Sequence, residues 1–438
     1  MERSSNTQDR QPASSLPSFR QLVAVFGKIG LLSFGGPAAQ IALMHRVLVD
    51  EQRWLDERRF LSALSFCMLL PGPEAMQLAT YAGWRLHGVK GGLAAGLLFV
   101  APGAALVLAL SMLYGAYGAT PTVAALFVGV KAAVLAIVLQ ALVRVGKRAI
   151  KGRLDWAAAF AAFVAIFFLD LPFPLVILAA AVAGYFLRAP GAMPAQAEAM
   201  APVPVSKTLG TLATWLAVWL VPLFAVTAVF GSGHVLAQLA FFFSKLAVVT
   251  FGGAYAVLAY MAQEAVSGYR WLTAGEMLDG LGLAETTNGP LILVTEFVGY
   301  IAALRAGGVA MGALGALVTL WATFAPCFLW IFVGAPYVER LTHAPRLASA
   351  LRTVTAAVVG VIANLSLWFA LHVVFAHVDE RQAGPLRLYV PDASTLDIAA
   401  LALSCLALVL IFALRWGIVA TLGACGAAAL LWLGLAPA

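Results

Sequence analysis

The sequence has 438 residues, of which 62% are hydrophobic and only 11% are charged, and its mean hydropathy is +0.93. Soluble domains carry about 25% charged residues, so this composition excludes an ordinary soluble protein. The formal net charge of +7 comes from Lys and Arg in short segments between apolar runs. That pattern is typical of the cytoplasmic loops of proteins embedded in a lipid bilayer and argues against a nucleic-acid partner.

The chain begins with a polar segment. Residues 1–20 contain Ser, Pro, Gln and three Arg, and they lack the apolar stretch of a cleavable signal peptide. We therefore expect 1–20 to be a disordered cytoplasmic tail.

Apolar runs of roughly 20 residues, the length that a helix needs to cross a bilayer, follow along the whole chain. They lie near 22–44, 60–84, 91–114, 121–143, 154–170, 172–187, 208–230, 235–261, 277–303, 307–334, 347–375, 394–414 and 416–436. Some are interrupted by glycine and proline, as at Gly35-Gly36-Pro37, Pro71-Gly72-Pro73 and Asn288-Gly289-Pro290. The sequence predicts an all-α integral membrane protein with about 12–13 transmembrane helices, some of them broken or re-entrant.

The linker 144–153 indicates the orientation, because it carries five Lys or Arg and should stay in the cytoplasm. Four spans precede it, which also puts the N-terminus in the cytoplasm. The loop from His45 to Arg59 fits less well: counted as a loop after one full span it is outside, yet it carries four Arg. Either its four acidic residues, Asp50, Glu51, Asp56 and Glu57, cancel this charge locally, or the first segment is re-entrant and the loop is inside; the sequence leaves both open.

Two parts of the chain match each other at a constant offset. At an offset of 217, Phe26-Gly27-Lys28-Ile29 matches Phe243-Ser244-Lys245-Leu246, Ser33-Phe34-Gly35-Gly36 matches Thr250-Phe251-Gly252-Gly253, Arg53-Trp54-Leu55 matches Arg270-Trp271-Leu272, and Gly72-Pro73 matches Gly289-Pro290. At an offset of 224, Ala101-Pro102 matches Ala325-Pro326. We expect two homologous repeats, 21–145 and 235–376, with linking helices in 146–234 and C-terminal helices in 377–438. Seven segments separate the starts of the copies, which predicts repeats of inverted topology, as in many secondary transporters.

The paired glycines are candidate anion ligands. Gly35 and Gly36, like Gly252 and Gly253, let backbone N–H groups turn toward an oxyanion at the start of a half-helix. The alternative is close helix packing through small residues. Lys28 and Lys245 lie two helical turns earlier, and a lysine inside a membrane segment is a functional candidate. Its alternative is snorkelling to a nearby interface.

A second group of candidates follows the Pro-Gly-Pro break. Glu74 begins a helix, Gln77 lies on nearly the same face, and Thr80 follows one turn later. The second copy has Asn288 at the break and Leu291 in place of Glu74, with Glu285 and Glu296 on either side. We expect the three glutamates to act in proton coupling or charge balance, with structural charge pairing as the alternative.

Other chemistry has little support. The cysteines Cys67, Cys327, Cys405 and Cys425 form no CxxC pair, and the six histidines form no cluster, so we expect no metal site and no cofactor. Nucleotide-binding and nucleophile motifs in a suitable context are absent from the sequence, which argues against an enzyme.

In these motifs the chain resembles the chromate ion transporter family, specifically its long two-domain members. The matching features are Phe-Gly-Gly-Pro at 34–37, the run Leu-Pro-Gly-Pro-Glu-Ala-Met-Gln-Leu-Ala-Thr-Tyr at 70–81, and Thr-Phe-Gly-Gly-Ala-Tyr at 250–255. The resemblance covers roughly residues 20–415. It implies export of chromate from the cytoplasm across a bacterial inner membrane, with sulfate as the isosteric competitor.

A tetrahedral dianion needs donors and balancing cations rather than catalytic groups. Our predicted ligands are the two lysines, the two glycine pairs, Gln77, Thr80 and Asn288. Uptake of sulfate or another oxyanion is the alternative function, and a homodimer is left open.

Overall fold

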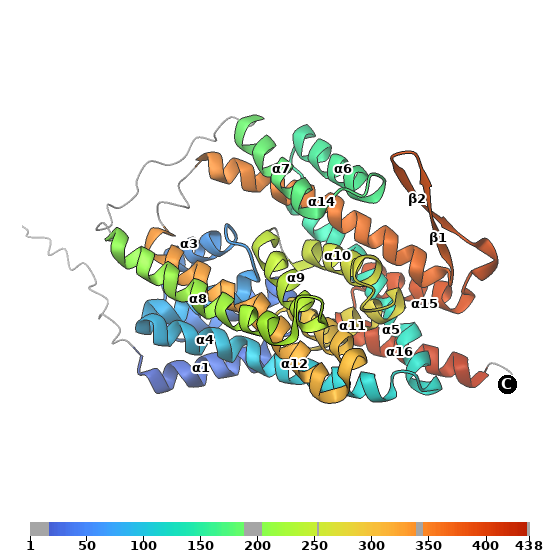
Figure 1. Ribbon diagram of the computed structural model, residues 1–438, viewed down its shortest axis with the longest axis horizontal. Helices are drawn as coiled ribbons and strands as arrows, with labels where there is room; N and C mark the ends of the chain where they lie inside the picture. The colour runs from blue at the N-terminus through green and yellow to red at the C-terminus, as the bar shows by residue number, and fades with distance from the viewer. Residues whose placement is uncertain (1–16, 188–203, 252–253, 339–344, 436–438) are drawn as a thin grey trace, which may run out of the picture.

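The computed structural model describes residues 17–187, 204–251, 254–338 and 345–435, and Figure 1 shows their arrangement. The protein is an all-α membrane protein, as predicted from the sequence. Five of the described helices are long and apolar enough to cross a membrane, and four shorter apolar helices accompany them. Each of the thirteen predicted apolar segments corresponds to one helix, to two helices separated by a break, or to part of a longer helix.

The elements fall into four groups along the chain. The first comprises α1 (Phe19–Leu32), α2 (Gly36–His45), η1 (Arg46–Glu51), α3 (Glu57–Cys67), α4 (Glu74–Tyr117) and α5 (Pro121–Ala149). The second comprises α6 (Arg153–Phe167), α7 (Phe173–Leu187) and α8 (Val205–Phe230). The third comprises α9 (Val235–Val249), α10 (Ala254–Gln263), η2 (Glu264–Gly268), α11 (Ala274–Thr286), η3 (Leu291–Leu293), α12 (Val294–Gly334), η4 (Ala335–Tyr337) and α14 (Pro345–Val374). The last comprises β1 (Val378–Ala383), β2 (Leu386–Pro391), η5 (Ala393–Thr395), α15 (Ile398–Leu408), η6 (Val409–Ala413) and α16 (Ile418–Leu435).

The two longest helices are in fact helical hairpins. The backbone of α4 leaves the helical region at His87 and Gly88, and that of α12 does so at Gly307 and Gly308. In α4 the two halves of the helix lie against each other on either side of the reversal. A Cβ added to Gly83 would be 2.3 Å from the Gly91 carbonyl oxygen, so the backbones are in close contact there. The positive φ angles of Gly88 (59°) and Gly308 (77°) explain why the turns use glycine.

The N-terminal group forms two short hairpins, one of α1 with α2 and one of α3 with the first half of α4. Both begin and end at one end of the molecule, which we call the proximal end. The His87 ring lies 2.7 Å from the Pro17 carbonyl, so α1 starts where the first half of α4 ends. His45, at the end of α2, contacts Glu57, at the start of α3, at 2.6 Å. Helices of 10–14 residues reach only about 15–21 Å, against a hydrocarbon core of about 30 Å. Both hairpins therefore turn back inside the protein.

This geometry decides between the two sequence alternatives for the loop from His45 to Arg59. The loop lies at the same end as Pro17, because its Arg58 and Arg59 line one cavity with Arg85, two residues before His87, as expected if the first segment is re-entrant. Its four arginines are then on the same side of the protein as Pro17.

The third group contains two further short hairpins, α9 with α10 and α11 with the first half of α12, which begin at the opposite, distal end. Trp271, before α11, receives a hydrogen bond from Arg305 at its carbonyl and donates one from Nε1 to Gln238 on α9. Gln263, at the end of α10, contacts Asp170 between α6 and α7 at 2.8 Å. In Figure 1 the proximal end lies at the left, with α1 and α3, and the distal end at the right, with the β-strands, α15 and α16.

The remaining helices surround these hairpins. In the most apolar 18-residue stretch of α14, 72% is buried inside the protein, whereas only 11% is buried in the corresponding stretch of α8. Helix α14 is therefore central, and α8 lies at the rim. Close backbone contact holds α14 against α6, since a Cβ on Gly360 would come within 1.9 Å of the Ala159 carbonyl oxygen.

One element is not foreseen in the sequence analysis. The antiparallel strands β1 and β2 form a hairpin over the distal end, with Ala383 paired to Leu386 at its turn. Arg387 is buried there and bonds to Asp170 at 2.6 Å and to the Ile166 carbonyl at 2.9 Å. The hairpin therefore covers the C-terminal end of α6.

Candidate functional site

The breaks in the four hairpins meet in the interior through two reciprocal backbone hydrogen bonds. We call the segments 33–35, 68–73, 250–251 and 287–290 the tip loops. The Gly72 N–H donates to the Thr250 carbonyl at 2.9 Å, and the Gly289 N–H donates to the Ser33 carbonyl at 2.8 Å. Each bond joins a tip loop of the first group to one of the third. The four residues also correspond at the offset of 217, so the two contacts are equivalent.

The tip loops 33–35 and 250–251 end their helices in the same way. The Ser33 hydroxyl donates to the Ile29 carbonyl, and the Thr250 hydroxyl donates to the Leu246 carbonyl, both at 2.6 Å. This satisfies one carbonyl of the last turn of each half-helix. The chain then turns sharply at Gly35 and Gly36, whose φ angles are 88° and 77°.

Two buried amides surround the second of these contacts. Gln40 on α2 donates from Nε2 to the Gly289 carbonyl at 2.6 Å and to the Ser33 carbonyl at 3.3 Å. Asn288 donates from Nδ2 to the Gly30 carbonyl at 3.1 Å. Both side chains are at most 5% exposed. They hold the 287–290 tip loop against α1 and α2.

A buried amide also lies beside the contact between Gly72 and Thr250. Gln77 is fully buried and donates from Nε2 to the Pro71 carbonyl at 2.7 Å. Its Oε1 atom is buried without a hydrogen-bond partner among the described residues, and so is Oε1 of Gln40. Buried polar atoms are normally paired. Two unpaired acceptors beside the tip loops therefore mark a place where a donor, such as water or a protonated ligand, can bind.

Thr80 and the glutamates have different surroundings. Thr80 is buried against the second half of α4, where its Oγ1 would be 2.4 Å from a Cβ added to Gly96. Its hydroxyl donates to the Met76 carbonyl. Glu74 is half-buried at the start of α4 and interacts electrostatically with Arg148 of α5. Glu285 accepts a 2.9 Å hydrogen bond from the Tyr255 hydroxyl. Glu296 is 1% exposed, and its Oε2 has no hydrogen-bond partner in the described ranges.

The two predicted lysine ligands are side chains at the protein surface. Lys28 and Lys245 are both exposed. Lys245 lies over the ring of Tyr260, with its Nζ 5.5 Å from the ring centroid. Their role as ligands stays a prediction. Gly252 and Gly253 lie outside the described residues.

Two other cations of the apolar segments bind buried carboxylates. Lys131 lies 3.3 Å from Asp279, and Arg352 lies 3.0 Å from the fully buried Asp155. Each pair compensates the charge of a buried carboxylate with a cation. Both pairs join helices that are far apart in the sequence.

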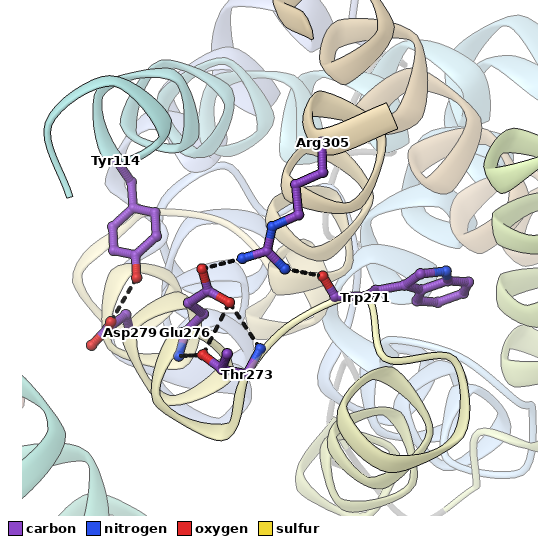
Figure 2. Close-up of polar contacts among 6 residues, drawn as sticks. All are labelled: Tyr114, Trp271, Thr273, Glu276, Asp279 and Arg305. Atoms are coloured by element: carbon purple, nitrogen blue, oxygen red, sulfur yellow. Dashed lines mark hydrogen bonds and ion pairs between the residues drawn. The ribbon is translucent and has the colours of Figure 1, made fainter. Parts of the chain in front are cut away.

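A polar network closes the distal side of the α11 and α12 hairpin (Figure 2). The Tyr114 hydroxyl donates to Asp279 at 2.7 Å, and Arg305 binds both Glu276 and the Trp271 carbonyl. Glu276 also completes a capping box with Thr273 at the start of α11. The network thus links the second half of α4, α11 and the first half of α12.

A metal centre has no candidate here. Within the ranges that the structure describes, no group of three or more His, Cys, Asp or Glu could hold a metal ion. The arrangement offers instead the backbone N–H groups at the half-helix starts and the amide N–H groups of Gln77 and Asn288, which can donate to an anion.

Comparison with known proteins identifies the family of the chain. The profile of the family described as chromate transporter matches residues 20–185 and again residues 237–431. The chain belongs to the chromate transporter family. It is 35% identical over 356 residues to a chromate transport protein of Pseudomonas aeruginosa, covering 79% of each chain. It is 30% identical over 350 residues to one of Cupriavidus metallidurans, covering 79% of this chain and 81% of the relative.

A probable chromate transport protein of Synechococcus elongatus is 30% identical over 348 residues, with 79% of this chain and 83% of the relative covered. No solved structure matches the chain. As a member of this family, the chain is a membrane transport protein. The two matched ranges contain all four tip loops.

Some residues of the site in this family member were missed from the sequence. Gln40 lies only three residues after Pro37, and an amide inside an apolar segment is a signal that could have found it. Asp279 and Tyr255 also lie in predicted apolar segments. Their partners, Lys131 with Tyr114 and Glu285, are remote enough in the sequence that no spacing rule connects them.

Close packing at the tip loops leads to a first prediction. A Cβ on Gly30 would lie 2.0 Å from the Leu98 carbonyl oxygen, whereas Gly27 on the same helix has nothing within 4 Å. Gly30→Ala should push α1 away from α4 and Asn288, and lower the free energy of unfolding by about 3 kcal/mol. Gly27→Ala should be neutral or slightly stabilising. Thermal unfolding of both purified variants compares them, and equal melting temperatures would contradict the packing.

Proposed function

We propose that the protein exports chromate from the cytoplasm across the bacterial inner membrane as a secondary transporter. The observation that carries the proposal is the reciprocal pair of tip-loop contacts, Gly72 with Thr250 and Gly289 with Ser33, inside a chromate transporter family member. Half-helix starts in the interior present unpaired backbone N–H groups and a partial positive charge to an oxyanion. Binding near the middle of the protein, between two halves, is the arrangement used by secondary transporters.

In this proposal the dianion binds between the tip loops. Gln77, Asn288 and the glycine pairs Gly35, Gly36, Gly252 and Gly253 supply hydrogen bonds, and Thr80 lines the α4 hairpin beside them. Lys28 and Lys245 contribute positive potential from a distance. Glu74, Glu285 and Glu296 balance charge or carry protons as the halves move.

The two halves act as inverted repeats in this account. Several observations support this view: the family profile matches twice, the elements follow the same order, and the hairpins begin at opposite ends. Arg53 and Arg270 even share a positive φ angle, 53° and 55°, after equivalent π-helical turns. Rocking of one half against the other would expose the tip loops to each side in turn.

Export fits the electrical driving force. Moving one charge through about 100 mV is worth about 2.3 kcal/mol, so a dianion leaving a negative interior gains about 4.6 kcal/mol. The proximal end, with its arginine-rich loop and the basic segment 144–153, would face the cytoplasm under the positive-inside rule. Uptake of sulfate against this potential would need coupled cations.

Flux of radiolabelled chromate into inside-out vesicles tests the proposal, with membrane potential and pH gradient imposed separately. We expect accumulation that is driven by a positive-inside potential and inhibited by sulfate. Unchanged oxidation state of the accumulated chromium serves as a control against enzymatic reduction. Accumulation of sulfate only in right-side-out vesicles would instead establish uptake, and no flux under any gradient would overturn the proposal.

A further inference from the structure

A basic cavity opens at the proximal end beside the α3 and α4 hairpin. Its volume is about 480 Å³. The lining residues include three arginines, Arg58, Arg59 and Arg85, together with Asp56, Tyr81 and Trp84. All three arginines are exposed, and Arg59 pairs with Asp56 at 3.3 Å. Arg58 and Arg85 have no ion-pair partner in the part of the chain that the structure describes. The cavity therefore has a net positive charge open to solvent.

The cavity leads toward the tip loops along one face of α4. Glu74, Gln77, Tyr81 and Arg85 follow at spacings of three or four residues, so they lie on the same side of the helix. Tyr81 and Arg85 line the cavity, and Gln77 locks the 68–73 tip loop. An anion that enters between Arg58 and Arg85 is thus at one end of a polar stripe whose other end is the proposed binding site.

The corresponding side chains at the distal end form hydrogen bonds and ion pairs with their neighbours. At the offset of 217, Arg59 and Ser62 of the cavity correspond to Glu276 and Asp279. Arg85, three residues before Gly88, corresponds to Arg305, three before Gly308. Figure 2 shows Glu276, Asp279 and Arg305 within the network that closes that end. The proximal positions thus line a cavity, whereas their distal counterparts are bonded to neighbouring side chains.

We propose that this cavity is the site at which the protein first captures a tetrahedral inorganic dianion, with Arg58 and Arg85 as its main ligands. The inference rests on the proposed function and names an additional binding site for its substrate. Two arginines can hold one dianion through charge-assisted, fork-shaped hydrogen bonds. The shared chemistry also fits the phosphate headgroup of an anionic lipid, so the experiment must separate a free anion from a lipid.

Calorimetric titration of sulfate into the purified full-length protein in neutral-lipid nanodiscs provides the binding test. Sulfate is used because it has the shape and charge of chromate without its oxidising power. Arg58→Gln together with Arg85→Gln should weaken sulfate binding about tenfold or more. The matched control is Arg381→Gln, an exposed arginine of the β-hairpin at the opposite end, which should bind sulfate as the wild type does.

A second measurement separates capture from transport. In inside-out vesicles the double variant should raise the apparent KM for chromate about tenfold with little change in the maximal rate. Absence of flux in the wild type, combined with weaker sulfate binding in the double variant, would overturn the proposed function and leave the capture site standing. Unchanged sulfate affinity and KM in a transporting double variant would overturn the capture site.

Nanodiscs containing about one third anionic phospholipid distinguish the two sources of phosphate-like ligand. If a free anion is the occupant, the wild type should keep most of its sulfate affinity in these nanodiscs. A fall of that affinity to the level of the double variant would mean that lipid headgroups fill the cavity, and would overturn the proposal.

Discussion

Gly72→Ala should abolish most transport and cost about 3 kcal/mol of stability. Gly72 has a φ angle of 120°, and a Cβ there would lie 2.9 Å from both Cys327 Sγ and Gln77 Nε2. Alanine is strained at this φ angle, and the displaced loop would lose the hydrogen bond from Gly72 to Thr250. The transport rate per folded protein and the melting temperature measure the two effects.

Two further variants separate the causes. The first is Gly384→Ala. Gly384 lies in the β-turn away from the tip loops, has a φ angle of 62°, and would have nothing within 4 Å of an added Cβ. This variant should keep normal transport despite backbone strain. Adding Cys327→Ala to Gly72→Ala removes one close contact and should recover part of the stability. Normal transport by Gly72→Ala would show that the loop contact has no role in function.

Lys131→Met should be the most destabilising single change at the distal network. Asp279 is 4% exposed, and Lys131 and Tyr114 are its partners. Removing the cation leaves a buried carboxylate without charge compensation, which typically costs about 3–5 kcal/mol. Tyr114→Phe should cost about 1.5–3 kcal/mol, because it removes one hydrogen bond to a charged group.

A double-mutant cycle distinguishes this pairing from simple packing. Asp279→Asn in the Lys131→Met background removes the stranded charge, so the double variant should be more stable than Lys131→Met alone. Chemical or thermal unfolding of the four proteins gives the coupling free energy. Additive effects of the two substitutions would contradict a direct interaction across α5 and α11.

Local sequence signals predicted the breaks but not their meeting. Glycine and proline at 35–37, 71–73 and 288–290 interrupt apolar runs, and each break is found where these residues lie. The hydrogen bond from Gly289 to Ser33 joins residues far apart in the chain, so only the packed helices reveal it. Periodicity along one helix contains no information about which break faces which.

Charges were harder to interpret for the same reason. Lys28 and Lys131 both lie in apolar segments, yet one is exposed and the other pairs with Asp279. The sequence gives the same cost of burial for both, and only the tertiary partner separates them. The β-hairpin was missed because its strands are only six residues long and the first of them is polar, although Gly384-Pro385 between them is a turn signal.

The most direct test of binding at the tip loops is the initial rate of potential-driven chromate accumulation by Asn288→Leu in inside-out vesicles. Its matched control is Asn364→Leu, because both asparagines are about equally buried and Asn364 lies beneath the β-hairpin, beside Arg387 and Tyr389. Loss of a buried hydrogen-bonding group at the site should lower the rate of Asn288→Leu about tenfold or more, with Asn364→Leu within about twofold of the wild type. Equal rates for the two variants, at equal amounts of folded protein, would contradict an anion path through the tip loops.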